Sequence, residues 1–212
     1  MTYAQFKALV LAYMKRTEAQ VNPSGVDVIL EATNAARRWA TRQHEFNQLK
    51  RFGYLQLASG DKTAWATVKP NYDLTGTAFT LQRVMTVHTA TSAGVVMPGL
   101  AVYGVDEEAV AEGVDTGIEY MRVDATYLYH DTAAIGSIVA LRGCEQLADL
   151  TTAATSDLFL DQYSDWLRLR VFNELNFYVA DDQRVNISLT YMEQLWKSVV
   201  QDDVSKARRA VT

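Results

Sequence analysis

The first residues of the chain alternate apolar and polar positions with the period of a helix. Thr2 and Gln5 form a capping-box signature, in which each residue satisfies a free backbone group near the helix start. The apolar positions that follow lie at helical steps: Phe6, Leu9, Val10, Tyr13 and Met14. The pattern predicts a first helix that ends near Ala19.

A second, longer helix is predicted after the turn residues 22–25. Ser24 is a favourable N-cap, and the carboxylate of Asp27 suits the first turn, where it meets the positive end of the helix dipole. The positions that keep the helical period are Ile29, Ala32, Ala36, Trp39, Gln43 and Phe46. They predict a helix of about six turns.

From Phe52 the period changes to that of strands. Two apolar runs, 54–57 and 64–68, flank the turn residues 59–62 and predict a hairpin. Further strand-like runs, separated by glycine and aspartate, occupy residues 79–81, 84–88, 95–96, 101–103, 120–123, 126–129 and 137–141. A short helical turn is predicted at residues 107–111. The middle of the chain is therefore predicted to be mostly β, as an antiparallel meander or sandwich.

Helical period returns after the polar residues 155–157, which can cap a helix. Its apolar stripe consists of Leu160, Tyr163, Leu167, Val171, Leu175 and Tyr178. Four aromatic residues widen this stripe: Phe159, Trp166, Phe172 and Phe177. So wide an apolar surface predicts burial against more than one neighbour or against another subunit, and these four residues are our subunit-interface candidates.

The last predicted helix follows the short connection 180–183, so it should lie antiparallel to the preceding helix. Its apolar positions are Val185, Leu189, Met192, Trp196 and Val199. Residues 206–212 lie beyond the last of these positions and are predicted to form a flexible basic tail. This tail contains Lys206, Arg208 and Arg209, which can become ordered on an acidic partner surface.

These elements predict an α+β protein. The helix pairs in residues 1–50 and 156–205 are expected to unite in a four-helix bundle, and residues 51–150 form an inserted antiparallel β-rich lobe. The chain of 212 residues is 49% hydrophobic, which is ordinary for a globular protein. No run approaches the roughly 20 apolar residues of a membrane span.

Charge and cysteine content restrict the function. With 25 acidic and 20 basic residues the net charge is -5, which argues against a surface that grips the phosphates of nucleic acid. The single cysteine, Cys144, excludes an intramolecular disulfide and a cysteine-rich metal site, and it indicates a reducing compartment.

Patterns of catalytic or cofactor-binding residues are absent from the sequence. The three histidines, His44, His88 and His130, have no second histidine or cysteine at the spacing of metal ligands. No glycine-rich phosphate loop and no nucleophilic-serine motif occurs. We therefore predict a protein without catalysis, cofactor or metal. The alternative from this class is a small enzyme that uses Cys144 or a histidine with a carboxylate.

Residues 157–167, the turn Asp181-Asp182-Gln183-Arg184 and residues 191–196 form a predicted helical hairpin. This hairpin resembles that of the head-to-tail adaptor proteins of tailed bacteriophages, also called connector or neck proteins. The layout of the whole chain, with an N-terminal helix pair, a β-rich insertion and the C-terminal hairpin, is similar as well.

The resemblance implies a structural virion protein that forms a homo-oligomeric ring, typically of twelve subunits in the family. Such a ring binds the portal protein and tail or nozzle proteins, and DNA passes through its channel without specific binding during genome ejection. It is assembled in the cytoplasm of the host bacterium and resides in the neck of the virion. Lys206, Arg208 and Arg209 are the expected portal-docking residues. A tail terminator or tail-tube protein is the alternative virion component.

Overall fold

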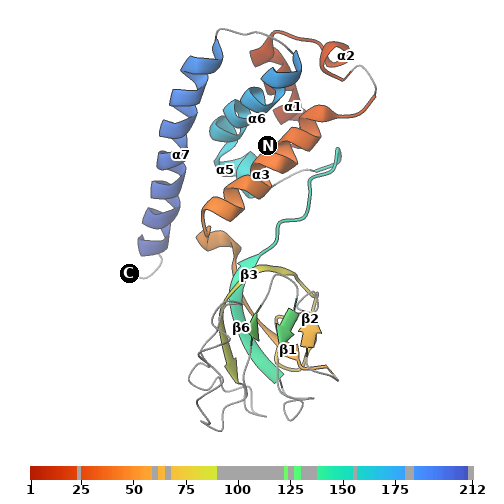
Figure 1. Cartoon of the computed structure of the whole chain (residues 1–212), viewed down its shortest axis with the longest axis vertical. Helices are drawn as coiled ribbons and strands as arrows, with labels where there is room; N and C mark the ends of the chain where they lie inside the picture. Colours follow the sequence, from red (N-terminus) through yellow and green to blue (C-terminus); the bar gives the residue numbers. More distant parts are fainter. Residues whose placement is uncertain are drawn as a thin grey trace. The chain divides into compact units, whose positions relative to one another are not determined.

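The computed structural model describes residues 1–22, 25–58, 62–64, 68–89, 122–123, 127–129, 138–154, 157–179 and 184–209. The chain divides into two compact units (Figure 1). One, the helical unit, consists of Met1–Asn47 and Leu147–Thr212, and the other, the β unit, of Gln48–Gln146. Helices and antiparallel strands are both present, so the predicted α+β class is confirmed.

The helical unit is built around one central helix. Its described helices are α1 (Tyr3–Met14), α2 (Glu18–Val21), α3 (Val28–Gln43), α5 (Leu158–Gln162), α6 (Ser164–Val179) and α7 (Arg184–Arg209). Because α6 packs against α1, α3 and α7, it is buried on several sides. The finer prediction of a four-helix bundle made of two helix pairs is not confirmed by this arrangement.

The first helix ends earlier than expected, at Met14 rather than near Ala19. Lys15 adopts the left-handed conformation, with φ of 54°, and the N–H groups of Lys15 and Arg16 donate back to carbonyls of the last turn. Such a left-handed residue closes a helix because it satisfies carbonyls that have no partner within the helix. At the other end, the predicted capping box at Thr2 is confirmed.

Asp27, not Ser24, is the N-cap of α3, and Ser24 lies outside the described residues. The Asp27 carboxylate accepts hydrogen bonds from the Leu30 N–H at 3.1 Å, the Tyr3 phenol at 2.9 Å and the Lys7 ammonium at 2.8 Å. Burial opposes ionisation of this carboxyl group, but these hydrogen bonds outweigh it and hold the pKa of Asp27 below its ordinary value.

α3 ends at Gln43, so the predicted helix is too long at this end, and Phe46 lies beyond it. A short 3-10 helix, η1 (Asn47–Leu49), leads into the β unit. The strands there are β1 (Lys50–Gln56), β2 (Lys62–Ala64), β3 (Leu81–Thr89), β4 (Arg122–Val123), β5 (Tyr127–Tyr129) and β6 (Ile138–Glu145). They form two antiparallel sheets, ordered β1-β6-β3 and β2-β5-β4.

The predicted hairpin between residues 54–57 and 64–68 is only partly described, because residues 65–67 lie outside the described residues. β1 pairs with β6 and β2 pairs with β5, and the described residues keep one isolated bridge, Tyr54–Lys69, of the expected contact. One core joins both sheets: Leu55, Leu57, Val68, Leu81, Val87, Leu128, Val139 and Leu141. The predicted strands at 95–96 and 101–103 and the helical turn at 107–111 lie outside the described residues.

A buried polar network holds the segment by which the chain returns to the helical unit. The guanidinium of Arg37 donates to the carboxylate of Asp157 at 2.6 Å, to the Asn34 side chain at 2.9 Å and to the Ala148 carbonyl at 3.1 Å. Asn34 in turn exchanges hydrogen bonds with the backbone of Leu150. Arg37 and Asp157 are both buried, so each charge depends on the other. We call these five residues the return anchor.

Candidate partner-binding surface

α7 lies antiparallel to α6, as predicted. Trp166 of α6 contacts Trp196, with ring centroids 5.0 Å apart, whereas Asn173, two turns later on α6, contacts Met192, one turn earlier on α7. Where the side chains of α7 are described, the buried ones form one stripe: Met192, Val199 and Asp203. Because α7 packs through this stripe, much of its remaining surface is exposed.

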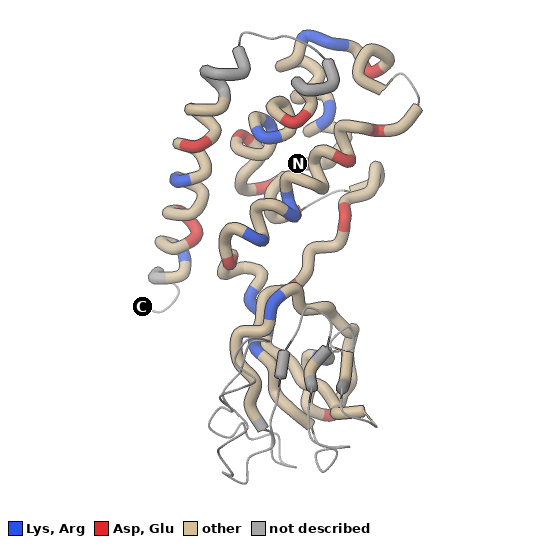
Figure 2. The backbone as a smooth tube through the Cα atoms, in the orientation of Figure 1, with Lys and Arg blue, Asp and Glu red and all other residues tan. Residues whose placement is uncertain are grey.

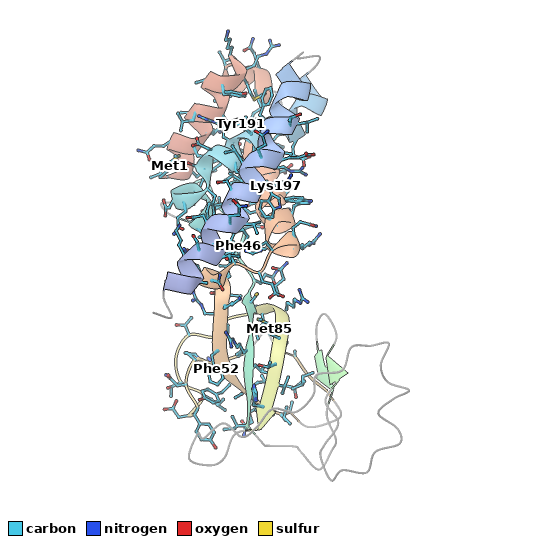
Figure 3. All side chains as sticks on the ribbon, turned by 90° about the vertical axis from the view of Figure 1, so that its left-hand side faces the viewer. Met1, Phe46, Phe52, Met85, Tyr191 and Lys197 are labelled. Carbon is cyan, nitrogen blue, oxygen red and sulfur yellow. The ribbon has the colours of Figure 1, made fainter. Side chains whose placement is uncertain are left out.

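Among the described side chains of α7, three large apolar ones are exposed: Leu189 by 39%, Tyr191 by 53% and Val204 by 38%. Leu189 and Tyr191 are two residues apart, so they point to nearly opposite sides of the helix. Figure 3 looks onto α7 and shows Tyr191 and Lys197 along it. Residues of both charge signs are spread along the same helix (Figure 2). The sequence pattern placed Leu189 in the inward stripe. It is exposed because Met192, Val199 and Asp203 turn inward and leave Leu189 at the edge of that stripe.

α1 exposes an apolar face. Its inward positions are Phe6, Val10 and Met14, whereas Leu9, which the pattern also placed inside, is 43% exposed. Ala4, Ala8 and Ala12, at four-residue steps on the same helix, are exposed as well. The sequence feature that indicates this exposed face is that α1 is apolar around most of its circumference. Periodicity alone assigns such residues to the core.

The apolar face of α1 and the side of α7 that carries Tyr191 belong to helices that meet α6 on different sides. Tyr13 of α1 contacts Phe172, with ring centroids 4.9 Å apart, whereas Met192 of α7 contacts the adjacent residue Asn173. Consecutive residues of a helix point about 100° apart. Each helix therefore presents its outer side in a different direction.

Three of the four predicted interface aromatics belong to the core of the chain itself. Phe159, Trp166 and Phe172 are buried within the helical unit. The wide apolar surface of α6 is explained by burial against three helices of the same chain, so we correct this part of the interface prediction. The side chain of the fourth residue, Phe177, lies outside the described residues.

The predicted flexible tail is wrong for residues 206–209, because α7 extends to Arg209. The Lys206 ammonium binds the Asp202 carboxylate at 2.6 Å and the Gln162 side chain at 3.0 Å, and it lies 5.6 Å from the centroid of the Tyr163 ring. These contacts hold the helix to its own chain beyond the last apolar position. The side chains of Arg208 and Arg209 and residues 210–212 lie outside the described residues.

The structure separates Cys144 from His88, but it does bring a histidine to a carboxylate, because the Nε2 atom of His44 lies 3.0 Å from Asp203. Cys144 is buried in β6, and His88 pairs with Ala140, four residues earlier on that strand, which corresponds to about 13 Å. His44 belongs to the helical unit, and His130 lies outside the described residues. The described ranges contain no group of three or more His, Cys, Asp or Glu side chains that could hold a metal ion.

None of the helices in the described part of the chain has the length and apolarity needed to cross a membrane. The sequence matches no protein-family model, and no curated protein is similar enough to it to count as a match. The functional argument therefore rests on the fold and on the exposed faces of α1 and α7.

Proposed function

We propose that this chain is a structural subunit of the neck of a tailed bacteriophage. In this proposal a ring of copies joins the portal to the tail or nozzle proteins and surrounds the channel for genome ejection. The observation that supports it best is that two helices expose apolar surface in different directions, α1 through Leu9 and its alanines and α7 through the side that carries Tyr191. A closed ring requires two different faces on each subunit, because each contact joins one face to the other.

The two faces differ in a way that suits such a contact. The outer side of α1 carries the small side chains of Ala4, Ala8 and Ala12, whereas one side of α7 presents the larger Tyr191. Small residues allow a neighbouring element to approach closely, and large apolar residues supply the area that is removed from water. We propose that α7 of one copy packs against α1 of the next.

The remaining parts of the chain take the other roles of an adaptor in this proposal. The four longer helices, α1, α3, α6 and α7, act as a four-helix frame into which the β unit is inserted. The end of α7, with Lys206, Arg208 and Arg209, docks on the portal, and the β unit meets the tail or nozzle proteins. The net charge of -5 favours passage of DNA without specific binding. Assembly takes place in the bacterial cytoplasm.

Electron microscopy of the purified chain mixed with the portal protein of the same phage tests the adaptor role. The expected result is a ring of this chain seated on the portal ring. Rings that form from the chain alone and do not bind the portal would contradict the adaptor role and favour a tail terminator or tail-tube protein.

The lateral contact is tested by Leu9→Glu and Tyr191→Glu, each of which places a charge in one of the two faces. Each variant alone should stay monomeric with an unchanged circular dichroism spectrum. An equimolar mixture should form dimers but no rings, because one intact α1 face and one intact α7 face remain per pair. Analytical ultracentrifugation measures these states.

Gln201→Glu is the matched control for these variants. It adds the same charge to an exposed position of α7, away from Leu189 and Tyr191 on the helix surface. Rings should form as in the unchanged protein. If Tyr191→Glu assembles equally well, α7 does not provide the lateral contact.

A further inference from the structure

A single buried carboxylate on α7 holds the residue at which the chain leaves the helical unit. Asp203 is 1% exposed, and it accepts the backbone N–H of Asn47 at 3.1 Å and the side-chain amide of Asn47 at 2.8 Å. The Nε2 atom of His44 lies 3.0 Å from the same carboxylate. The Asn47 amide also donates to the Asp203 carbonyl at 3.2 Å. We call Asp203, Asn47 and His44 the exit latch.

The exit latch lies at a boundary in the chain. Asn47 is the last residue of the helical unit and the first residue of η1, which leads directly into β1. The partners in the latch are separated by 156 residues in sequence, so Asp203 closes a long loop of chain. Loss of the buried Asp203 carboxylate removes these acceptors from the backbone N–H and the side-chain amide of Asn47, which costs free energy.

The last turns of α7 carry a second set of contacts close to the latch. Lys206 follows Asp203 by three residues and binds Gln162 and Asp202 over the Tyr163 ring. Residues three apart lie on the same side of a helix. Release of Lys206 therefore frays the helix turn that positions Asp203, since helix ends open locally at much lower free energy than the core.

We infer that the exit latch makes undocking of the α7 C-terminal end and release of residues 44–49 one cooperative event. A partner that draws Lys206 away from α5 and the Tyr163 ring thereby loosens the residues that lead into the β unit. The coupling is a property of the chain alone and goes beyond the proposed adaptor role, because it needs neither a portal nor a ring.

Hydrogen exchange of the full chain, followed by mass spectrometry of peptides, tests this coupling. In Asp203→Ala we expect exchange at residues 44–49 and at residues 199–207 to rise together, by about threefold or more. Lys206→Ala is the decisive variant, because Lys206 has no contact with Asn47 or His44 among the contacts described for it. It should also raise exchange at residues 44–49.

Three comparisons decide the outcome. Lys197→Ala, at an exposed position of the same helix, should leave both segments unchanged, and Asn47→Ala should raise exchange at residues 199–207. Peptides from α6, which packs against three helices of the unit, should stay protected in every variant, which shows that the chain remains folded. If Lys206→Ala frees the end of α7 while residues 44–49 stay protected, the inference is wrong. Lys206→Ala and Asn47→Ala keep the test valid if Asp203→Ala does not fold.

Discussion

The chain passes between its two units twice, and the two crossings are held differently. The return anchor fixes residues 148–157 to the middle of α3 through Arg37 and Asp157, which are both buried ions. The exit latch fixes Asn47 to the last turns of α7 through one buried carboxylate. One crossing is therefore tied to the interior of the helical unit and the other to the end of a peripheral helix.

This difference indicates which crossing can open while the rest of the protein stays folded. Opening the return anchor leaves a charge in apolar surroundings, which costs several kcal/mol. The exit latch needs only the fraying of one helix end, after which water reaches the freed polar groups. The return crossing therefore shares the stability of the core, whereas the exit crossing has a lower free energy of opening.

The largest effect is expected for Arg37→Ala. This variant leaves the Asp157 carboxylate buried without its partner, so the free energy of unfolding should fall by about 3–5 kcal/mol, measured by urea denaturation. Arg38→Ala is the matched control at the next position. Arg38 forms an exposed pair with Asp149, and its loss should change stability by less than about 1 kcal/mol. Equal losses in the two variants would refute the structural role of the return anchor.

A smaller effect is expected for Asp203→Ala, which removes acceptors from Asn47 and His44. The free energy of unfolding should fall by about 1–3 kcal/mol, because the freed groups become hydrated when the end of α7 frays. The return anchor and the exit latch share no residue, so their effects should add. The double variant Asn34→Ala/Asp203→Ala should equal the sum of the single variants within about 0.5 kcal/mol. A larger deviation would show that the crossings are not independent.

The helix ends show how much of the fold can be predicted from residues that are neighbours in sequence. The capping box at Thr2 and the polar cap before α5 depend on neighbouring residues, and both were predicted. The cap of α3 was assigned to Ser24 because the advantage of Asp27 comes partly from Tyr3 and Lys7, which belong to another helix. Periodicity identified the main helices, but their ends depend on tertiary contacts.

Long-range partners could not be predicted. Arg37 and Asp157 are separated by 120 residues, and β1 pairs with β6, which follows it only after the rest of the β unit. The wide apolar surface of the C-terminal helices was recognised, but apolar spacing does not distinguish a neighbour in the same chain from another subunit. Trp166 was therefore predicted at an interface although it is in the core, and Leu9 was predicted in the core although it is exposed.

The pH dependence of stability also bears on the return crossing, because Asp27 caps α3, the helix that contains Arg37. The pKa of Asp27 is lowered in the folded state, so its contribution is present above the unfolded value of about 3.9 and is lost as the pH falls through the folded value. Asp27→Asn keeps a capping side chain but removes the titration. It should cost about 1 kcal/mol near neutral pH and make stability fall less steeply below pH 5.

Urea denaturation at several pH values measures the acid effect. Asp165→Asn is the control, because it removes an exposed carboxylate from α6 without touching a cap of α3. If Asp27→Asn and the unchanged protein lose stability equally between about pH 5 and pH 3, Asp27 does not couple folding to protonation.

The smallest effect is expected for Tyr163→Phe, which tests what holds the end of α7. Burial, together with the carboxylates of Asp203 and Asp202, raises the pKa of Tyr163 to about 12. Because the pKa of Tyr163 is raised in the folded state, the neutral phenol contributes stability to the fold. This contribution is present below the ordinary tyrosine pKa of about 10 and is lost as the pH rises through the pKa of the folded state. An NMR titration of ¹³C-labelled tyrosine should lose one resonance with a pKa near 12 in the variant.

Tyr163→Phe also distinguishes the contribution of the hydroxyl group from that of the aromatic ring. The hydroxyl lies 3.4 Å from the Asp202 carboxylate, so its loss should cost about 0.5–1 kcal/mol. Phenylalanine keeps the aromatic face next to Lys206, so the end of α7 should stay docked and residues 44–49 should stay protected from exchange. Increased exchange at residues 44–49 in Tyr163→Phe would show that the hydroxyl contact with Asp202, rather than the Lys206 contacts, keeps the exit latch closed.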